Sequence, residues 1–313
     1  MNTYLGPHSM TLWLVFTAGV LFFLILDVVL LHKKSHEPSI KEALVESALW
    51  ISLGLGFNVW VYFNLGHDLG MEFLTGYLVE KSLSIDNLFI ILLVFNSLKI
   101  PKMYQHRVLF WGVFGAIVMR AALIMVGVKL INEFHWILYI FGGILVFSGY
   151  KLLFDKAHDV DIAKHWSIKL LKKFVPVTYH FHGDRFLAKE GGVLMATPMM
   201  AALVLVEATD LIFAVDSIPA VFAVTKDPFI AFSSNIMAVM GLRALYFVLA
   251  TSVGKLRYLK PGLAVILFYI GLKMLLLDVF HIPSHFSLMI IIGILATAGI
   301  GSWYADRNDE KAS

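Results

Sequence analysis

The sequence has no cysteine and few charged residues. Among its 313 residues, 25 are Lys or Arg and 22 are Asp or Glu, so that 15% are charged while 59% are hydrophobic. Without cysteine, neither a disulfide framework nor a thiolate metal site can form. The mean hydropathy of +0.80 lies far outside the balance of a soluble globular domain. The composition therefore indicates a protein of the lipid bilayer.

The small positive net charge of +3 does not indicate a nucleic-acid partner. In membrane proteins, Lys and Arg gather in cytoplasmic loops for topological reasons. The first apolar stretch, at about residues 10–31, is too long for the apolar region of a signal peptide and lacks a basic segment before it. We therefore expect a retained first helix and a bilayer environment. The sequence does not indicate a protein partner.

A transmembrane helix needs about 20 mostly apolar residues. Nine segments meet this requirement, which predicts an all-α polytopic membrane protein with about nine transmembrane helices. The predicted spans are residues 10–31, 43–64, 71–97, 108–131, 136–154, 193–223, 229–252, 262–280 and 286–304.

The positive charges of the connections alternate along this series. Every second connection is basic, and the connections between them contain only Lys226. The positive-inside rule then predicts an outside N-terminus and a cytoplasmic C-terminus in a cell inner membrane. The basic residues of the alternate connections are Lys33, Lys34 and Lys41; Lys99, Lys102 and Arg107; a dense run from Lys151 to Lys189; Lys255, Arg257 and Lys260; and Arg307 and Lys311.

The chain divides around one long polar segment, residues 156–192. We expect this cytoplasmic linker to form an amphipathic helix at about residues 162–174, lying at the membrane interface. Residues 1–66 then contain two helices, residues 67–155 and 193–280 contain three each, and residues 281–313 contain the last helix and a cytoplasmic tail.

The two three-helix units share an acidic motif. Glu80 and Asp86 are six residues apart in E-K-S-L-S-I-D-N, and Asp210 and Asp216 are six residues apart in D-L-I-F-A-V-D-S. Such internal self-similarity predicts a structural repeat.

Two further landmarks keep their spacing. Arg120 and Arg243 each follow the acidic motif by one predicted helix. Gly149 and Gly271 follow by another, at separations of 29 residues (149 minus 120) and 28 residues (271 minus 243). Because three helices separate equivalent elements, the second unit enters the membrane from the opposite side. The spacing thus predicts an inverted repeat, which is typical of secondary transporters with a site near the midplane.

Several acidic residues lie inside these apolar segments. Each ionised side chain at the centre of a lipid-embedded helix costs about 3 kcal/mol even on permissive scales. A functional site is therefore the default interpretation, and helix-packing ion pairs are the alternative. The candidate metal-ligating residues are Glu80, Asp86, Asn87, Glu207, Asp210, Asp216 and Ser217, and the candidate gating or charge-compensating residues are Lys81, Arg120, Arg243 and Lys273.

The candidate ligands are all oxygen donors. Six residues along a regular helix advance about 9 Å and rotate about 600°, so Glu80 and Asp86 would point to different faces unless the helix breaks. Pro198 and Pro219 predict such a break in the second motif segment. An oxygen-rich site without sulfur suits hard cations such as Mg²⁺, Ca²⁺ or Mn²⁺. The histidines lie in predicted loops or at helix ends, which disfavours a zinc enzyme core.

The two acidic segments, E-K-S-L-S-I-D-N-L-F from Glu80 and E-A-T-D-L-I-F-A-V-D-S-I-P-A from Glu207, resemble the signature stretches of the TerC family of integral membrane proteins. Further similar runs, such as G-L-R-A-L-Y-F from Gly241, extend the likeness from about Phe73 to Pro283. Within the family the pattern is closest to the Alx type. This resemblance implies manganese export from the cytoplasm and assigns the motif carboxylates to that task.

The resulting expectation is a secondary transporter that exports a divalent cation, Mn²⁺ as substrate, in exchange for protons. It needs no prosthetic group and is not an enzyme. Two alternatives stay open. One is an intramembrane enzyme of the lipid-phosphate hydrolase type, which would need a positioned nucleophile or base. The other is an auxiliary membrane scaffold in tellurite or metal stress resistance.

Overall fold

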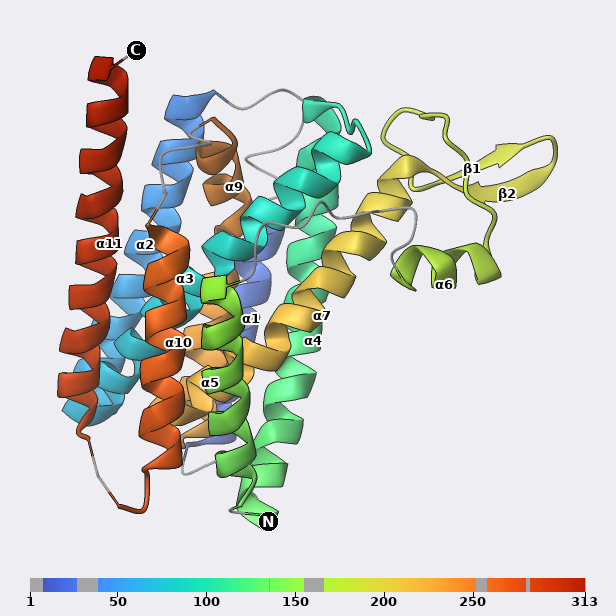
Figure 1. The fold of residues 1–313 in the computed structure, drawn as a ribbon. Coiled ribbons are helices and arrows are strands. Elements are labelled where there is room, and N and C mark those ends of the chain that lie inside the picture. The colour runs from blue at the N-terminus through green and yellow to red at the C-terminus, as the bar shows by residue number, and fades with distance from the viewer. Residues whose placement is uncertain are drawn as a thin grey trace.

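The chain forms a bundle of long helices with one small excursion to its side (Figure 1). The computed structural model describes residues 8–26, 39–134, 136–154, 166–251, 258–279 and 282–312. Its elements are α1 (Met10–Leu26), α2 (Ile40–Asn64), α3 (His67–Ser97), α4 (Lys102–Glu133), α5 (Ile137–Phe154), α6 (Trp166–Phe174), β1 (Leu187–Glu190), β2 (Val193–Ala196), α7 (Pro198–Val224), α8 (Pro228–Val239), α9 (Leu242–Thr251), α10 (Leu259–Leu275) and α11 (Ser284–Ala312).

The predicted spans overlap described helices, although 229–252 overlaps two of them and 193–223 begins in a strand. The described helices also differ in how apolar they are. Six spans are long and apolar enough to cross a bilayer: α2, α4, α5, α7, the combined α8–α9 segment, and α11. The other three are α1 and α10, with 17 described residues each, and α3, whose 31 residues include five charges. The fold is therefore an all-α polytopic membrane protein.

Local sequence signals explain where several helices begin. Ser39 caps α2 in a capping box, because its side chain accepts from the backbone N–H of Glu42 while Glu42 accepts from the backbone N–H of Ser39. Asp227 caps α8 by accepting from two backbone N–H groups, and Pro228 follows in the first turn. These signals place helix starts at both ends of the bundle.

The linker contains more structure than the sequence predicts. Its amphipathic helix, α6, is described from Trp166, while residues 162–165 of the predicted helix lie outside the described residues. The strands β1 and β2 then form an antiparallel hairpin with Leu187 opposite Ala196. The predicted span at 193–223 was too long at its start, because residues 193–196 belong to β2 and the helix begins at Pro198.

The predicted span at 229–252 is interrupted. The helix α8 ends at Val239, and α9 begins at Leu242. Gly241, between them, has φ of +81°, a conformation that L-residues other than glycine rarely adopt. A Cβ atom at this position would also lie 2.5 Å from the Cβ of Trp50 on α2. The break is thus specified by a glycine, which the apolar pattern did not reveal.

The third helices of the two predicted units, α5 and α10, pack against each other in antiparallel orientation. A Cβ atom on Gly149 would lie 2.8 Å from the carbonyl oxygen of Ala264, and one on Gly142 would lie 3.1 Å from the carbonyl oxygen of Gly271. The contact residues advance from 142 to 149 along α5 but retreat from 271 to 264 along α10, so the two helices are antiparallel. The glycines let the two backbones approach, as small residues do between membrane helices.

The centre of the bundle is formed by four helices from both predicted units. α3 and α4 each pack against both α7 and α8. Four polar residues of these helices (Ser84, Asn87, Ser234 and Asn235) are at least nine-tenths buried there, within otherwise apolar surroundings. The candidate site lies where these four helices meet.

Candidate ion-binding site

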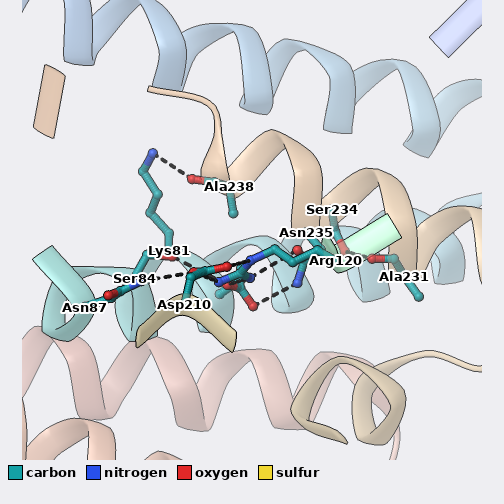
Figure 2. A network of polar contacts seen from close by, with 10 residues as sticks. Lys81, Ser84, Asn87, Arg120, Asp210, Ala231, Ser234, Asn235 and Ala238 are labelled. Atoms are coloured by element: carbon teal, nitrogen blue, oxygen red, sulfur yellow. Dashed lines mark hydrogen bonds and ion pairs between the residues drawn. The ribbon is translucent and has the colours of Figure 1, made fainter. Parts of the chain in front are cut away.

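Arg120 lies at the middle of the polar centre. It is the largest fully buried side chain among the described residues, with 1% of its surface exposed. From α4, its guanidinium reaches between α3, α7 and α8 (Figure 2). Nη1 pairs with Glu80 and Nη2 donates to Oδ1 of Asp210 at 2.8 Å. A buried charge requires such pairing, because desolvation without a partner costs several kcal/mol.

Its two carboxylate partners occupy equivalent positions of the repeated motif. Glu80 stands first in E-K-S-L-S-I-D-N, and Asp210 stands first in D-L-I-F-A-V-D-S. Their exposed fractions are 0% and 4%. The structure therefore brings the first acid of each motif to a single cation, with Glu80 supplied by α3 and Asp210 by α7.

Two amide side chains complete the network. Asn235 of α8 donates to Oε2 of Glu80 at 2.9 Å and accepts from Nη1 of Arg120 at 3.2 Å. Asn87 of α3 donates to Oδ1 of Asp210 at 3.0 Å. The Oδ1 atom of Asn87 is buried and accepts no hydrogen bond from the described residues. This amide oxygen lies at the edge of the carboxylate cluster and can still accept a hydrogen bond or serve as a metal ligand.

The network carries more negative than positive charge. With one guanidinium and two carboxylates it has a formal charge of −1, while its amides are neutral. Its oxygen atoms come from carboxylates, amides and the hydroxyl of Ser84, which lies 3.5 Å from Oε1 of Glu80. This composition suits a hard divalent cation, provided that the guanidinium withdraws from the carboxylates.

Glu207 and Ser217 lie on the same helix as Asp210 but outside these contacts. The carboxylate of Glu207 is half-buried against α4, where a Cβ atom on Gly115 would lie 2.0 Å from its Oε1 atom. Ser217 is buried, and its hydroxyl has no hydrogen-bond partner among the described residues. Glu207 is one helical turn before Asp210, so that it approaches the network from α7.

The second acids of the two motifs are not part of the network. Asp216 accepts a hydrogen bond from Ser148 of α5 at 2.6 Å. Asp86 is half-buried on α3. The helical break expected to unite Glu80 with Asp86 is absent, because α3 continues from His67 to Ser97 and α7 continues past Pro219 to Val224.

Among the described contacts of the candidate charge-compensating residues, those of Arg120 reach the carboxylates of the network. Arg243 of α9 donates to Glu46 of α2 at 2.6 Å. Lys273 of α10 donates to Ser287 of α11 at 2.9 Å. Lys81 turns away from the network toward α8. The equivalence of Arg120 and Arg243 in the sequence is therefore not matched by equivalent partners.

Asn235 was missed by reasoning from the sequence. It follows two serines in F-S-S-N-I-M, and all three polar residues are completely buried. Three adjacent polar residues in an apolar span are the signal that would have indicated a polar helix interface at α8.

A cavity of about 530 Å³ lies at one end of the bundle, between the start of α3 and the connections that follow α7 and α10. Glu72 of α3 lines it and accepts a hydrogen bond from Thr225 at 2.6 Å. Glu72 precedes Glu80 by eight residues, or about 12 Å along the helix. Other charged or titratable lining residues are His67, Asp68, Lys226, Asp227, Lys273 and His285.

Comparison with known proteins places the chain in a family. Residues 65–310 match the family described as "Integral membrane protein TerC family". An uncharacterized membrane protein of Myxococcus xanthus is 44% identical over 308 residues, covering 98% of this chain and 97% of the relative. A Salmonella typhi protein described as "Putative membrane-bound redox modulator Alx" is 42% identical over 321 residues, covering 99% of both chains. No solved structure matches.

The chain belongs to the TerC family. The family match extends beyond the region, about Phe73 to Pro283, in which the sequence motifs showed the likeness. All residues of the polar network lie inside the TerC match, whereas Glu46, the partner of Arg243, lies before it. The network is thus built from the part of the chain that defines TerC membership.

Proposed function

We propose that this protein is a secondary transporter that exports a divalent metal cation, with Mn²⁺ as substrate, from the cytoplasm in exchange for protons. The observation that supports this proposal is the convergence of Glu80 and Asp210, from equivalent motif positions, on the buried Arg120. A guanidinium held between two carboxylates occupies the place where a cation would be most stable.

Arg120 acts in this proposal as a tethered cation. Without substrate, it neutralises the carboxylates and stabilises the closed bundle. When Mn²⁺ enters, the ion takes oxygen ligands from Glu80, Asp210 and Asn87, and Arg120 withdraws. About six oxygen ligands suit such an ion, so that water and the neighbouring Asn235 and Ser84 would complete its shell. Protons would return on carboxylates that the metal has left.

The proposed membrane arrangement has nine spans, an outside N-terminus and a cytoplasmic C-terminus in the cell inner membrane. It contains an inverted repeat of residues 67–155 and 193–280, with 156–192 as the cytoplasmic linker. The antiparallel packing of α5 and α10 supports this repeat, because their paired close approaches at Gly142 and Gly149 are what a two-fold axis in the membrane plane would generate.

Alternating access requires a path to each side. The cavity lined by Glu72 provides the outer path in this proposal, since it opens at the end of the bundle where α3 begins and α7 ends. Glu72, which lines this cavity, is about two helical turns from Glu80 along α3. Asp86 lies on α3 at the other side of Glu80, which assigns it to the cytoplasmic path.

Flux of Mn²⁺ into proteoliposomes containing the purified protein tests the proposal. The wild type should transport Mn²⁺, and Glu80→Gln and Asp210→Asn should abolish transport because each leaves the site with one carboxylate. Asp278→Asn, at an exposed carboxylate that accepts from Tyr139, is the matched control and should transport like the wild type.

Absence of wild-type flux under an imposed proton gradient would reject transport and favour the hydrolase or scaffold alternatives. The topology has a separate test. Reporter fusions after His67 and after Lys173 should report opposite sides of the membrane, and a common side would overturn the inverted repeat.

A further inference from the structure

Lys81, the neighbour of Glu80 in the motif, contacts the end of α8 instead of an acid. Its Nζ atom donates to the carbonyl oxygen of Ala238 at 3.1 Å (Figure 2). It also donates to the carbonyl oxygen of Met240 at 3.3 Å. Lys81 is half-buried, and no carboxylate is within salt-bridge distance of it among the described residues. Its partner is therefore the backbone of another helix.

The two carbonyl groups belong to the helix break. In a continuous helix they would accept from N–H groups four residues later, but the ladder stops where Gly241 turns at a positive φ. The last carbonyls of a helix have no partner in the helix and carry its negative dipole end. The ammonium group of Lys81 supplies hydrogen bonds to these carbonyls and a positive charge at the negative end of the dipole. The contact thus explains how the end of α8 is stable in the interior of the bundle.

Two adjacent residues of α3 consequently contact the second half of α8. Glu80 accepts from Asn235, and Lys81 donates to Ala238. A third contact lies farther along, where a Cβ atom on Gly76 would be 3.5 Å from the Cβ of Ser234. By contrast, α9 is connected to α2 through Arg243 and Glu46. α9 also contacts α3 through the rings of Tyr246 and Phe95, so the Lys81 contacts are specific to the α8 side of the break.

We infer that Lys81 is a positioning residue that fastens α8 to α3, so that the two move as one unit about a hinge at Gly241 when the state of the carboxylate network changes. This inference rests on the proposed transport function. Because Lys81 does not touch the proposed ligand oxygens, its role is in the conformational step and not in ion capture. A conformational step limits the maximal rate of many such cycles.

Substitution of Lys81 by Met removes the donors and the charge while it keeps most of the length of the side chain. In proteoliposomes, Lys81→Met should lower the maximal rate of Mn²⁺ transport at least tenfold per folded molecule while KM stays within about twofold. Lys81→Arg restores charged donors and should recover most of the rate. Lys129→Met, which removes an exposed lysine of α4 that lies 4.0 Å from Glu133, is the matched control and should change neither quantity.

A second experiment tests the proposed hinge by cysteine labelling, without measuring transport. The natural chain has no cysteine, so Met240→Cys introduces a single reporter at a buried position of the break. In detergent, Lys81→Met should accelerate labelling of this cysteine by a water-soluble maleimide, and Lys81→Arg should not.

The outcomes separate the two proposals. Absence of Mn²⁺ flux in the wild type rejects the transport function, whatever the labelling shows. Flux in the wild type together with an unchanged rate and unchanged labelling in Lys81→Met rejects the hinge inference alone. A rise in KM with an unchanged maximal rate would also overturn it, because that result would place Lys81 in ion capture.

Discussion

Arg120 binds Asp210 through two hydrogen bonds, from Nη2 to Oδ1 at 2.8 Å and from Nε to Oδ2 at 3.2 Å. This two-point contact fixes the plane of the guanidinium relative to the carboxylate, which a lysine could not do. The remaining nitrogen, Nη1, then points to Glu80 and Asn235. The geometry makes Asp210 the two-point partner of Arg120 and Glu80 a one-point partner that also accepts from Asn235.

Removal of the guanidinium should destabilise the protein and make it more sensitive to metal. In Arg120→Met, two buried carboxylates lose their cation, and breaking a buried ion pair typically costs about 3–5 kcal/mol. Mn²⁺ bound to the vacated site should return part of this loss, about 2.7 kcal/mol at a hundred times its Kd. Thermal unfolding in detergent with and without Mn²⁺ measures both effects.

The control for this prediction is an arginine at the surface. Arg107 pairs with Asp184 in the linker, and both side chains are partly exposed. Arg107→Met should therefore cost less than about 1 kcal/mol and show no added response to Mn²⁺. If Mn²⁺ stabilises Arg120→Met no more than it stabilises the wild type, the carboxylates do not form the proposed ion site.

The sequence predicted the fold class and much of the centre because both depend on local patterns. Apolar runs of about 20 residues place the membrane helices with few alternatives. An acid inside such a run must find a partner in the bundle interior, which correctly selected Glu80, Asp210 and Arg120 as buried polar residues. The family was also confirmed, through motifs that lie in these same segments.

Features that depend on tertiary contacts could not be predicted. Nothing in the spacing distinguishes Arg120 from Arg243, yet Arg120 pairs with motif carboxylates while Arg243 pairs with Glu46 of α2. The prolines suggested a break in α7, but α7 is continuous. A break lies instead between α8 and α9 at Gly241, where a Cβ atom would clash with the side chain of Trp50. Whether a glycine lies in a helix or ends one is decided by its neighbours in space, which sequence periodicity does not contain.

The contact between α5 and α10 gives a prediction about stability. Gly149→Ala places a Cβ atom 2.8 Å from the carbonyl oxygen of Ala264, and a backbone group cannot move aside as a side chain can. Overpacking of this kind typically costs about 1–3 kcal/mol. Gly143 lies on the same helix with open space around it, so that Gly143→Ala should be neutral or stabilising by up to about 1 kcal/mol. Unfolding temperatures of both variants in one detergent provide the comparison.

The β1–β2 hairpin should lose stability in acid. The hydrogen bond from His182 is the main cause that lowers the pKa of Glu190 from its ordinary value of 4.5, and a second bond from Thr178 adds to it. A carboxyl group whose pKa is lowered by folding contributes stability above its unfolded pKa and loses that contribution as the pH falls through its folded pKa. The hairpin should therefore weaken as the pH falls below about 4.5.

Limited digestion by an acid-active protease can follow this change in the intact protein. The rate of cleavage within residues 187–196 should rise steeply as the pH falls for the wild type. In Glu190→Gln, which cannot ionise, cleavage should be fast throughout, and the ratio of the two rates at each pH cancels the pH dependence of the protease. A ratio that stays constant from about pH 6 to pH 3 would contradict the assigned role of Glu190.

The second acids of the two motifs, Asp86 and Asp216, should affect transport differently from the first acids, Glu80 and Asp210. Asp216 accepts a hydrogen bond from Ser148 of α5, and Asp86 lies on α3, outside the described contacts of the network around Arg120. Asp86→Asn and Asp216→Asn should each slow Mn²⁺ transport without abolishing it, because each removes charge from the path and leaves the network around Arg120 intact. Substitutions at independent sites add in free energy, so the double variant should show the product of the two reductions.

Glu80→Gln and Asp210→Asn should behave differently, because both act on one site. Their double variant should be no worse than either single one, as expected for residues that work as a unit. Four single and two double variants, compared by initial rates in proteoliposomes at equal protein density, measure both patterns together. If Asp86→Asn and Asp216→Asn each abolish transport and their double variant adds nothing, these two acids belong to the ion site itself. The site would then require a conformation in which α3 and α7 bring their second acids together.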